Sequence, residues 1–372
     1  MNDKIAKKPR LPGLQALRAL AFLGIFTTHT GLTGLGAFGV SVFFVLSGFL
    51  MFYNYADREL PCSFKENALF GIRKIRKLYP LHIIGMFAIL PVVIGEMLAA
   101  YSTEYLFIVI AQILLNVTLL QSLVPGEWYY FALNGIMWYL SASMIIYALF
   151  PLVMKGLKKI GSARGAGLSA VLVFLLQIGL GALSQFVHIP GGSFENFPKW
   201  FTYINPFFRL GDFYIGMVLG RLASGGLNRG KGKGSLKRRL LFTALELLTV
   251  LVSVLLQLIY DRRAGGFLGA EFYRYTMLFT PASAALVWLF SSPEGFLTKA
   301  LNNPVFVHIG NISAVTYIIH QIIIKYFDEL TKLLTGEVMN VWPKTLITLG
   351  ITLGLAEVYV LIEKRIGKKK KI

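Results

Sequence analysis

The chain has 372 residues, of which 55% are hydrophobic and only 15% are charged, and its mean hydropathy is +0.64. This composition excludes a soluble globular domain and indicates a protein that crosses a membrane several times. The single cysteine, Cys62, excludes an intramolecular disulfide framework and a metal site built from several cysteines.

The formal net charge is +19, which in a soluble protein would suggest a nucleic-acid partner. Here the lysines and arginines cluster in short loops between apolar runs, so a positive-inside topology and attraction to anionic lipids explain most of the excess. We therefore expect membrane lipids as partners and no nucleic acid. A basic cytoplasmic face would also favour an anionic soluble substrate.

Eleven apolar segments approach the roughly 20 residues that a spanning helix needs. The first is expected to be retained as a helix, because no small-residue cleavage site follows it. In chain order the segments cover residues 14–31, 36–55, 80–100, 104–122, 134–154, 166–187, 205–222, 238–260, 273–291, 304–326 and 345–363.

Basic loops, which should face the cytoplasm, divide these segments into groups of two, three, two and four. The group of three contains the most polar segment, 104–122, which we therefore expect not to cross fully. The prediction is an all-α bundle of about ten transmembrane helices plus one possible re-entrant helix, with both termini cytoplasmic, in a bacterial plasma membrane. It forms a single membrane-embedded domain over residues 1–372, in which 55–79 is a basic cytoplasmic loop and 224–239 a flexible one.

Arg18 and His29 lie in the first apolar segment, eleven residues apart. In a helix this spacing is about 1100 degrees, three turns plus some 20 degrees, with a rise of roughly 16 Å. Both side chains therefore share one face, which should point into the bundle because either would be costly in lipid. Each alone has an ordinary explanation, Arg18 as an interfacial anchor and His29 as a packing histidine. Together on one face they favour a functional site.

The chemistry of this face suits a long anionic substrate. An imidazole, with its ordinary pKa of about 6.5, is a natural general base, and a guanidinium can hold phosphate. A substrate with an anionic head and a reactive group about 16 Å away would match the helix rise. Acyl-CoA has this shape.

Seven stretches, in order from start to finish, resemble the acyltransferase 3 family of integral-membrane acyltransferases. The first is the R-x10-H pattern of Arg18 and His29. The others are "GAFGVSVFFVLSGFLMF" (36–52), "RKIR" (73–76), "MWYLSASMIIYALFPLV" (137–153), "RLGDFYIGMVLG" (209–220), "NISAVTYIIHQIII" (311–324) and "VLIEKRI" (360–366).

This resemblance implies O-acylation, usually O-acetylation from cytoplasmic acetyl-CoA, of a hydroxyl on a cell-envelope glycan, exopolysaccharide or lipid-linked sugar. His29 would be the catalytic histidine and Arg18 its partner, while Arg73 and Arg76 would bind the CoA phosphates. The donor is acyl-CoA and no metal is implied. His29 would act either as a general base or as the acceptor of the acyl group in a double displacement.

At two positions the chain lacks a carboxylate that the family pattern often has. Ser41 and Ser143 stand where the family often has Asp and Glu, whereas Asp212 keeps an acidic position. Glu246 or Glu357, which lie inside apolar runs, are candidate replacements for the missing carboxylate. Possible acceptor-site or supporting residues are Ser47, Trp138, Tyr147, Asp212 and His320.

The histidines form no obvious metal site. His308 and His320 are about 120 degrees apart on one helix, His82 and His188 have ordinary surroundings, and no zinc-binding pattern occurs. Ser47, which precedes a glycine, fits close helix packing better than a nucleophile.

Two other functions remain open on sequence grounds. A transporter or flippase of a saccharide or lipid would also bury ionisable residues in a helix bundle, although no internal repeat is visible. The second is a catalytically degenerate membrane sensor, with which the replacement of two motif carboxylates by Ser41 and Ser143 would be compatible.

Overall fold

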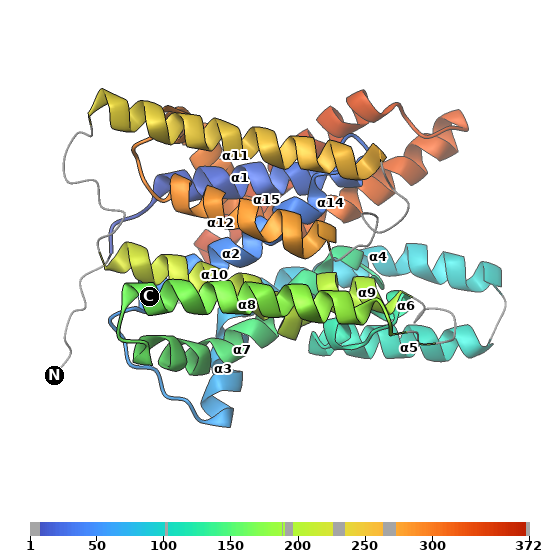
Figure 1. The fold of residues 1–372 in the computed structure, drawn as a ribbon. Coiled ribbons are helices and arrows are strands. Elements are labelled where there is room, and N and C mark those ends of the chain that lie inside the picture. Colours follow the sequence, from blue (N-terminus) through green and yellow to red (C-terminus); the bar gives the residue numbers. More distant parts are fainter. Residues whose placement is uncertain are drawn as a thin grey trace.

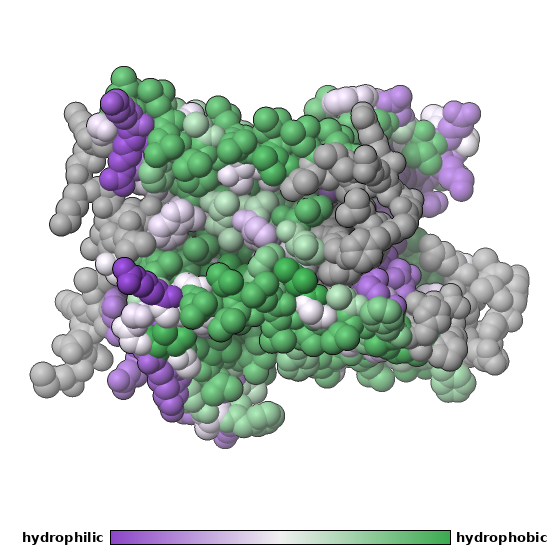
Figure 2. All heavy atoms as spheres, viewed as in Figure 1, coloured by the Kyte–Doolittle hydropathy of each residue, from purple (hydrophilic) through white to green (hydrophobic). Residues whose placement is uncertain are grey.

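The computed structural model describes residues 8–100, 103–187, 189, 196–225, 235–262 and 273–369, and these residues form helices and no strand. Long helices run side by side, and α1 begins at the end of the bundle where α15 finishes (Figure 1). Figure 2 shows hydrophilic side chains gathered at both ends of this face and a hydrophobic band between them. This distribution is the one expected for helices that cross a membrane.

Each of the eleven predicted segments coincides with helical structure. The agreement follows from hydropathy, because an apolar run of this length must pair its backbone groups internally in lipid. The helices are α1 (Pro12–His29), α2 (Gly36–Tyr55), α4 (Tyr79–Ala100), α5 (Thr103–Thr118), α7 (Trp138–Lys159), α8 (Ala163–Ser184), α10 (Pro206–Ser224), α11 (Leu236–Arg262), η6 (Tyr273–Leu278) continuing into α12 (Phe279–Phe290), α14 (Pro304–Thr335) and α15 (Val341–Lys369).

The number of spans is lower when only length and apolar composition of the described residues are used. Five helices then qualify, and six if a bent pair counts as one span. The pair consists of residues 64–75 and 79–95, which meet at 65°. Charged residues explain part of the shortfall, since α10 carries Arg209, Asp212 and Arg221. A membrane protein is supported, and the count of ten spans stays a prediction.

The interval 55–79, predicted as a basic loop, contains a helix, α3 (Phe64–Ile75). Ser63 and Glu66 form a capping box, in which each side chain bonds the backbone N–H of the other. The sequence analysis weighed only the charges of this interval and missed that signal. The other predicted loop, 224–239, lies largely outside the described residues.

The remaining helical elements are short and lie in the connections. The partly crossing segment predicted at 104–122 ends as helix at Thr118, and Leu119 turns the chain with φ of +54°. The short elements are η1 (Gln121–Leu123), α6 (Glu127–Tyr130), η2 (Gly135–Met137), α9 (Phe197–Lys199), η4 (Trp200–Ile204) and α13 (Phe296–Leu301).

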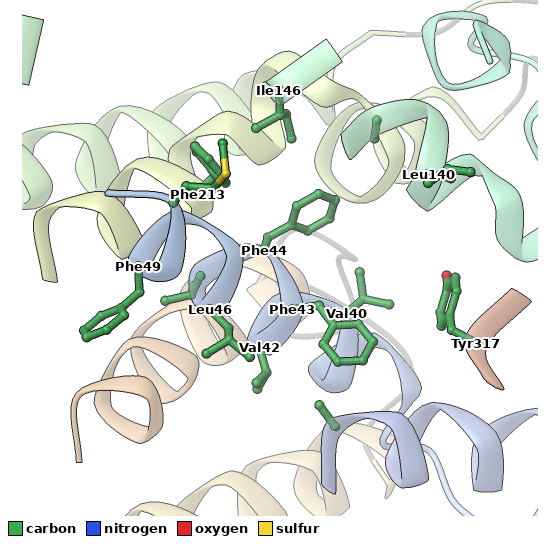
Figure 3. Close-up of a cluster of buried hydrophobic side chains, with 14 of the residues drawn as sticks. Val40, Val42, Phe43, Phe44, Leu46, Phe49, Leu140, Ile146, Phe213 and Tyr317 are labelled. Atoms are coloured by element: carbon green, nitrogen blue, oxygen red, sulfur yellow. The ribbon is translucent and has the colours of Figure 1, made fainter. Parts of the chain in front are cut away.

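Helix α2 is the centre of the packing. Its side chains are buried on most sides of the helix (Figure 3). The exposed fraction is at most 8% for Val42, Phe43, Phe44, Leu46 and Phe49. It approaches α10 through glycines, since a Cβ added to Gly48 or Gly216 would lie 1.9 Å from a carbonyl oxygen of the opposite helix. Small residues at such positions let two backbones touch, which is a common way to join helices in membranes.

We expect Gly48→Ala and Gly216→Ala each to destabilise the protein by about 1–3 kcal/mol, because backbone atoms must move apart to admit the methyl group. The measurement is the thermal unfolding midpoint of the purified protein in detergent. Gly167→Ala in α8 is the matched control, since nothing lies within 4 Å of its Cβ position. Equal midpoints for all three variants would contradict the close-contact interpretation.

Candidate active site

His29 lies at the last position of α1, where the chain turns sharply. Gly31 adopts φ of +87°, a conformation that glycine reaches without strain. The Thr28 hydroxyl accepts the backbone N–H of Gly36 at 2.7 Å and so joins the end of α1 to the start of α2. The imidazole is therefore presented by a fixed helix end.

The partner of His29 is His320 of α14. Nε2 of His320 lies 3.0 Å from Nδ1 of His29, and the ring centroids are 5.0 Å apart. The two rings can approach each other because the backbones of α1 and α14 are in close contact at Gln15 and Gly310. A Cβ added to Gly310 would lie 2.0 Å from the carbonyl oxygen of Gln15. Two residues 291 positions apart in sequence thus form one unit.

The hydrogen bonds determine which nitrogen of each neutral ring carries a proton. Nδ1 of His320 lies 2.7 Å from the carbonyl oxygen of Tyr317, which can only accept, so this nitrogen donates. Nε2 of neutral His320 then accepts from Nδ1–H of His29. The remaining nitrogen of His29, Nε2, keeps a free lone pair, as a base or nucleophile requires.

His29 borders a cavity of about 460 Å³, here called the histidine cavity. Its walls combine aromatic and aliphatic side chains with polar groups from α1 and α14, as is usual for small-molecule sites. The lining residues are Ile25, Thr28, His29, Gly34, Gly36, Ala37, Val40, Phe131, Gly135, Ile136, Trp138, Tyr203, Tyr275, Tyr317, Gln321 and Lys325.

Arg18 borders a second cavity of about 160 Å³, here called the arginine cavity. Two cations, Arg18 and Lys74, line it, and no carboxylate does so among the described residues. Its lining residues are Arg18, Phe43, Ser47, Lys74, Ile75, Leu78, Met137, Tyr139, Leu140, Ser143, Tyr147, Ser313, Ala314, Tyr317 and Ile318.

Tyr317 is the residue common to both cavities. Its hydroxyl donates to the carbonyl oxygen of Ile136 at 3.0 Å, and its ring lies 5.4 Å from that of Tyr139 and 6.1 Å from that of Phe43. In Figure 3 it faces α2 from the opposite helix. Tyr317 therefore forms part of the wall between the cavities and also holds His320 through its carbonyl oxygen.

The sequence analysis named Arg18 as the partner of His29 on the same helix face, and a catalytic role for Arg18 stays a prediction. The two residues line different cavities, and His320 contacts the His29 ring instead. The reason is the helix rise of roughly 16 Å over eleven residues, which is too long for an arginine side chain to reach the imidazole.

Of the basic residues in "RKIR", Lys74 lines the arginine cavity, whereas Arg73 and Arg76 are exposed on α3 and line neither cavity. The Lys74 ammonium donates to the Tyr55 hydroxyl at 2.6 Å and lies 4.2 Å from the centre of that ring. The sequence analysis overlooked Lys74 because it assigned the motif to its two arginines. An amphipathic α3 would have indicated that the middle lysine faces inward.

The other predicted supporting residues divide between the two cavities. Ser47 and Tyr147 border the arginine cavity, together with Ser143. Trp138 borders the histidine cavity, where its ring lies 4.8 Å from that of Tyr203.

Asp212 lies in neither cavity. It forms a fully buried ion pair of 2.8 Å with Arg209 and accepts hydrogen bonds from Thr280 and Gln177. Arg209 also donates to the Ser41 hydroxyl at 2.8 Å. The position where the family often has Asp thus faces this arginine, so its residue belongs to an ion-pair network rather than to the site around His29.

The two acids considered as replacements also have structural partners. Glu246 accepts from the Thr298 hydroxyl and from the Leu297 backbone N–H at the start of α13. Glu357 binds His308. Neither lines either cavity.

The remaining histidines are consistent with ordinary roles where they are described. His82 is buried and bonds the carbonyl oxygen of Asn116, and His188 lies outside the described residues. No metal-binding group of His, Cys, Asp and Glu occurs within the described part of the chain.

Comparison with known proteins gives a consistent result. The family described as "Acyltransferase domain" (Acyl_transf_3) matches residues 11–359. The curated protein "Acyltransferase MdmB" of Streptomyces mycarofaciens is 26% identical over 299 residues, which cover 79% of this chain and 70% of that protein. No solved structure matches the chain.

We expect Asp212→Asn to cost about 3–5 kcal/mol of stability, because it leaves the buried Arg209 guanidinium without a counter-charge. Nε and Nη1 of Arg209 have no hydrogen-bond partner within the described residues, so adding Ser41→Asp should recover at least half of the loss. The measurement is the thermal unfolding midpoint in detergent.

Asp57→Asn is the control, because the Asp57 carboxylate that pairs with Lys8 is 64% exposed, and pairs with a solvent-exposed partner contribute about 0–1 kcal/mol. An Asp212→Asn midpoint as high as that of the control would contradict a stabilising ion pair.

Proposed function

Since the chain belongs to the acyltransferase 3 family and is an acyltransferase, we propose that it transfers an acyl group, in the simplest case acetyl, from acyl-CoA to a saccharide hydroxyl. The acceptor is a glycan, exopolysaccharide or lipid-linked sugar of the cell envelope. The observation that carries the proposal is the His29–His320 pair, which leaves Nε2 of His29 unprotonated beside a cavity of substrate size.

The arginine cavity is the proposed donor side. Arg18 and Lys74 supply two cations without a lining carboxylate among the described residues, which favours phosphate or thioester oxygens. A volume of about 160 Å³ admits only the pantetheine arm, so the nucleotide stays outside, where Arg73 and Arg76 are exposed on α3. Arg18 thus assists His29 through the donor rather than by direct contact.

The histidine cavity is the proposed acceptor side. The aromatic rings of Trp138, Tyr203 and Tyr275 offer faces for a sugar, and Gln321 supplies an amide. The basic loops orient the donor side to the cytoplasm, so that the acceptor side faces the other surface of a bacterial plasma membrane and both termini are cytoplasmic.

In the direct mechanism, Nε2 of His29 takes the proton from the acceptor hydroxyl while the oxygen attacks the thioester carbonyl carbon. The carbon–sulfur bond breaks, and the CoA sulfur leaves and takes the proton from His29. In the double displacement, Nε2 itself attacks the thioester carbonyl carbon, and the carbon–sulfur bond breaks to release CoA as the thiolate. The acceptor oxygen then attacks the acyl carbon, the carbon–nitrogen bond to His29 breaks, and the hydroxyl proton passes to the CoA sulfur. His320 holds Nδ1–H of His29 in both routes.

The first test replaces the proposed base. We expect His29→Ala to lower transfer by about 100- to 10,000-fold, because it removes the group that accepts the proton or the acyl chain. The measurement is transfer from radiolabelled acetyl-CoA to isolated envelope glycans by the purified protein. His308→Ala is the matched control, since His308 is exposed and bonds Glu357 away from both cavities. Transfer by His29→Ala at the wild-type rate would refute the assignment.

The second test concerns the donor side. Loss of one charge-assisted contact should raise the KM for acetyl-CoA about tenfold or more in Lys74→Gln and in Arg18→Gln. Steady-state release of CoA at varied acetyl-CoA concentration measures it. Lys65→Gln, at the exposed start of α3, should leave KM unchanged. If Lys74→Gln and Lys65→Gln gave the same KM, the arginine cavity would not be the donor site.

A further inference from the structure

Lys325 lies on α14 at the edge of the histidine cavity, and the reaction proposed above makes no use of it. No acidic side chain pairs with it within the described residues, whereas the neighbouring Lys199 pairs with Glu127 at 2.8 Å. Among the described residues, Lys325 is therefore a cation without an acidic partner on the proposed acceptor side. A charge held in a partly buried wall without a counter-charge attracts an anionic ligand.

Lys325 also stands at a junction. A third cavity of about 320 Å³, here called the side cavity, shares Phe131 and Lys325 with the histidine cavity. Gln112, Glu127 and Trp128 are among its other lining residues. Because Lys199 pairs with Glu127, the side cavity has little uncompensated negative charge. Lys325 can thus contact a ligand that extends from one cavity into the other.

The amide beside Lys325 presents donors. Gln321 lies one helical turn earlier on the same face, and its Oε1 accepts the backbone N–H of Ile136 at 3.1 Å. Because Oε1 accepts this hydrogen bond, the NH₂ group of Gln321 is left to donate hydrogen bonds to a ligand. An ammonium and an amide NH₂ together suit the oxygens of an acid group and of neighbouring hydroxyls.

The histidine cavity relates Lys325 to the proposed catalytic residue. Lys325 and His29 both line this cavity, so one ligand that occupies it can contact both side chains. An acid group bound at Lys325 then belongs to the same acceptor molecule whose hydroxyl lies beside His29.

We propose that Lys325 binds a carboxylate or phosphate of the acceptor. The acceptor is then an acidic saccharide that extends from the histidine cavity into the side cavity. This inference rests on the proposed function and specifies its acceptor. Lys325 sets specificity and takes no part in the chemistry at His29.

The test uses the purified full-length protein with acetyl-CoA and three probes: methyl glucuronide, glucose 6-phosphate and the neutral methyl glucoside. Binding is measured from the thermal unfolding midpoint at varied probe concentration, and transfer from the mass of the acetylated sugar. We expect the wild type to bind and acetylate at least one charged probe about 10- to 100-fold better than the neutral one. Tighter binding of methyl glucuronide would indicate a carboxylate ligand, and tighter binding of glucose 6-phosphate would indicate a phosphate ligand.

Variants at one position then identify the cation. Lys325→Met should bring the charged-to-neutral ratio towards one, Lys325→Arg should keep it, and Lys325→Glu should reverse it. Lys332→Met is the matched control, since Lys332 is an exposed lysine later on the same helix, and it should keep the wild-type ratio.

The proposal is overturned if the wild type binds no charged probe, if it prefers the neutral probe, or if Lys325→Met retains the preference. Binding of a charged probe that Lys325→Met abolishes, with no acetyl transfer by the wild type, would support Lys325 while refuting the acyl-CoA reaction. Transfer that ignores charge would refute this inference and leave the acyl-CoA reaction standing.

Discussion

The contact between the backbones of α1 and α14 is the constraint on which the site depends. Gly310 lies directly against the backbone at Gln15, and no side chain keeps the helices apart there. His29 at the end of α1 and His320 in the middle of α14 consequently meet, with ring nitrogens 3.0 Å apart. Helix α2, fixed to α10 through its own glycines, supplies the opposite side of both cavities.

Charges are distributed unevenly through this framework. The acids considered for the site have structural partners: buried Asp212 neutralises Arg209, buried Glu246 caps α13, and partly exposed Glu357 binds His308. The cations at the cavities, Arg18, Lys74 and Lys325, have no acidic partner in the described part of the chain. In the proposed reaction both substrate sides therefore favour negatively charged ligands, while the proposed site around His29 uses a neutral imidazole pair instead of a carboxylate.

Hydropathy and helical spacing predicted much of this arrangement. Apolar runs located all eleven major helices, and a spacing of eleven residues indicated that Arg18 and His29 face inward. Local charge alone misled at 55–79, where the Ser63–Glu66 capping box starts α3. The contact of His29 with His320 could not be predicted, because it depends on how two helices 291 residues apart cross. Tyr317 was missed for a similar reason, since only the packed bundle shows that it borders both cavities. Lys74 was missed because its motif was assigned to the two arginines.

The wall formed at Tyr317 has a consequence for the cell. An enzyme whose donor and acceptor sides joined in one open, water-filled path would let protons and ions leak down their gradients. Tyr317, bonded to Ile136 and packed against Tyr139, is the described residue that lines both cavities. In the proposed reaction this side chain is therefore the group that has to limit such a leak while the acyl group passes from the donor side to the acceptor side.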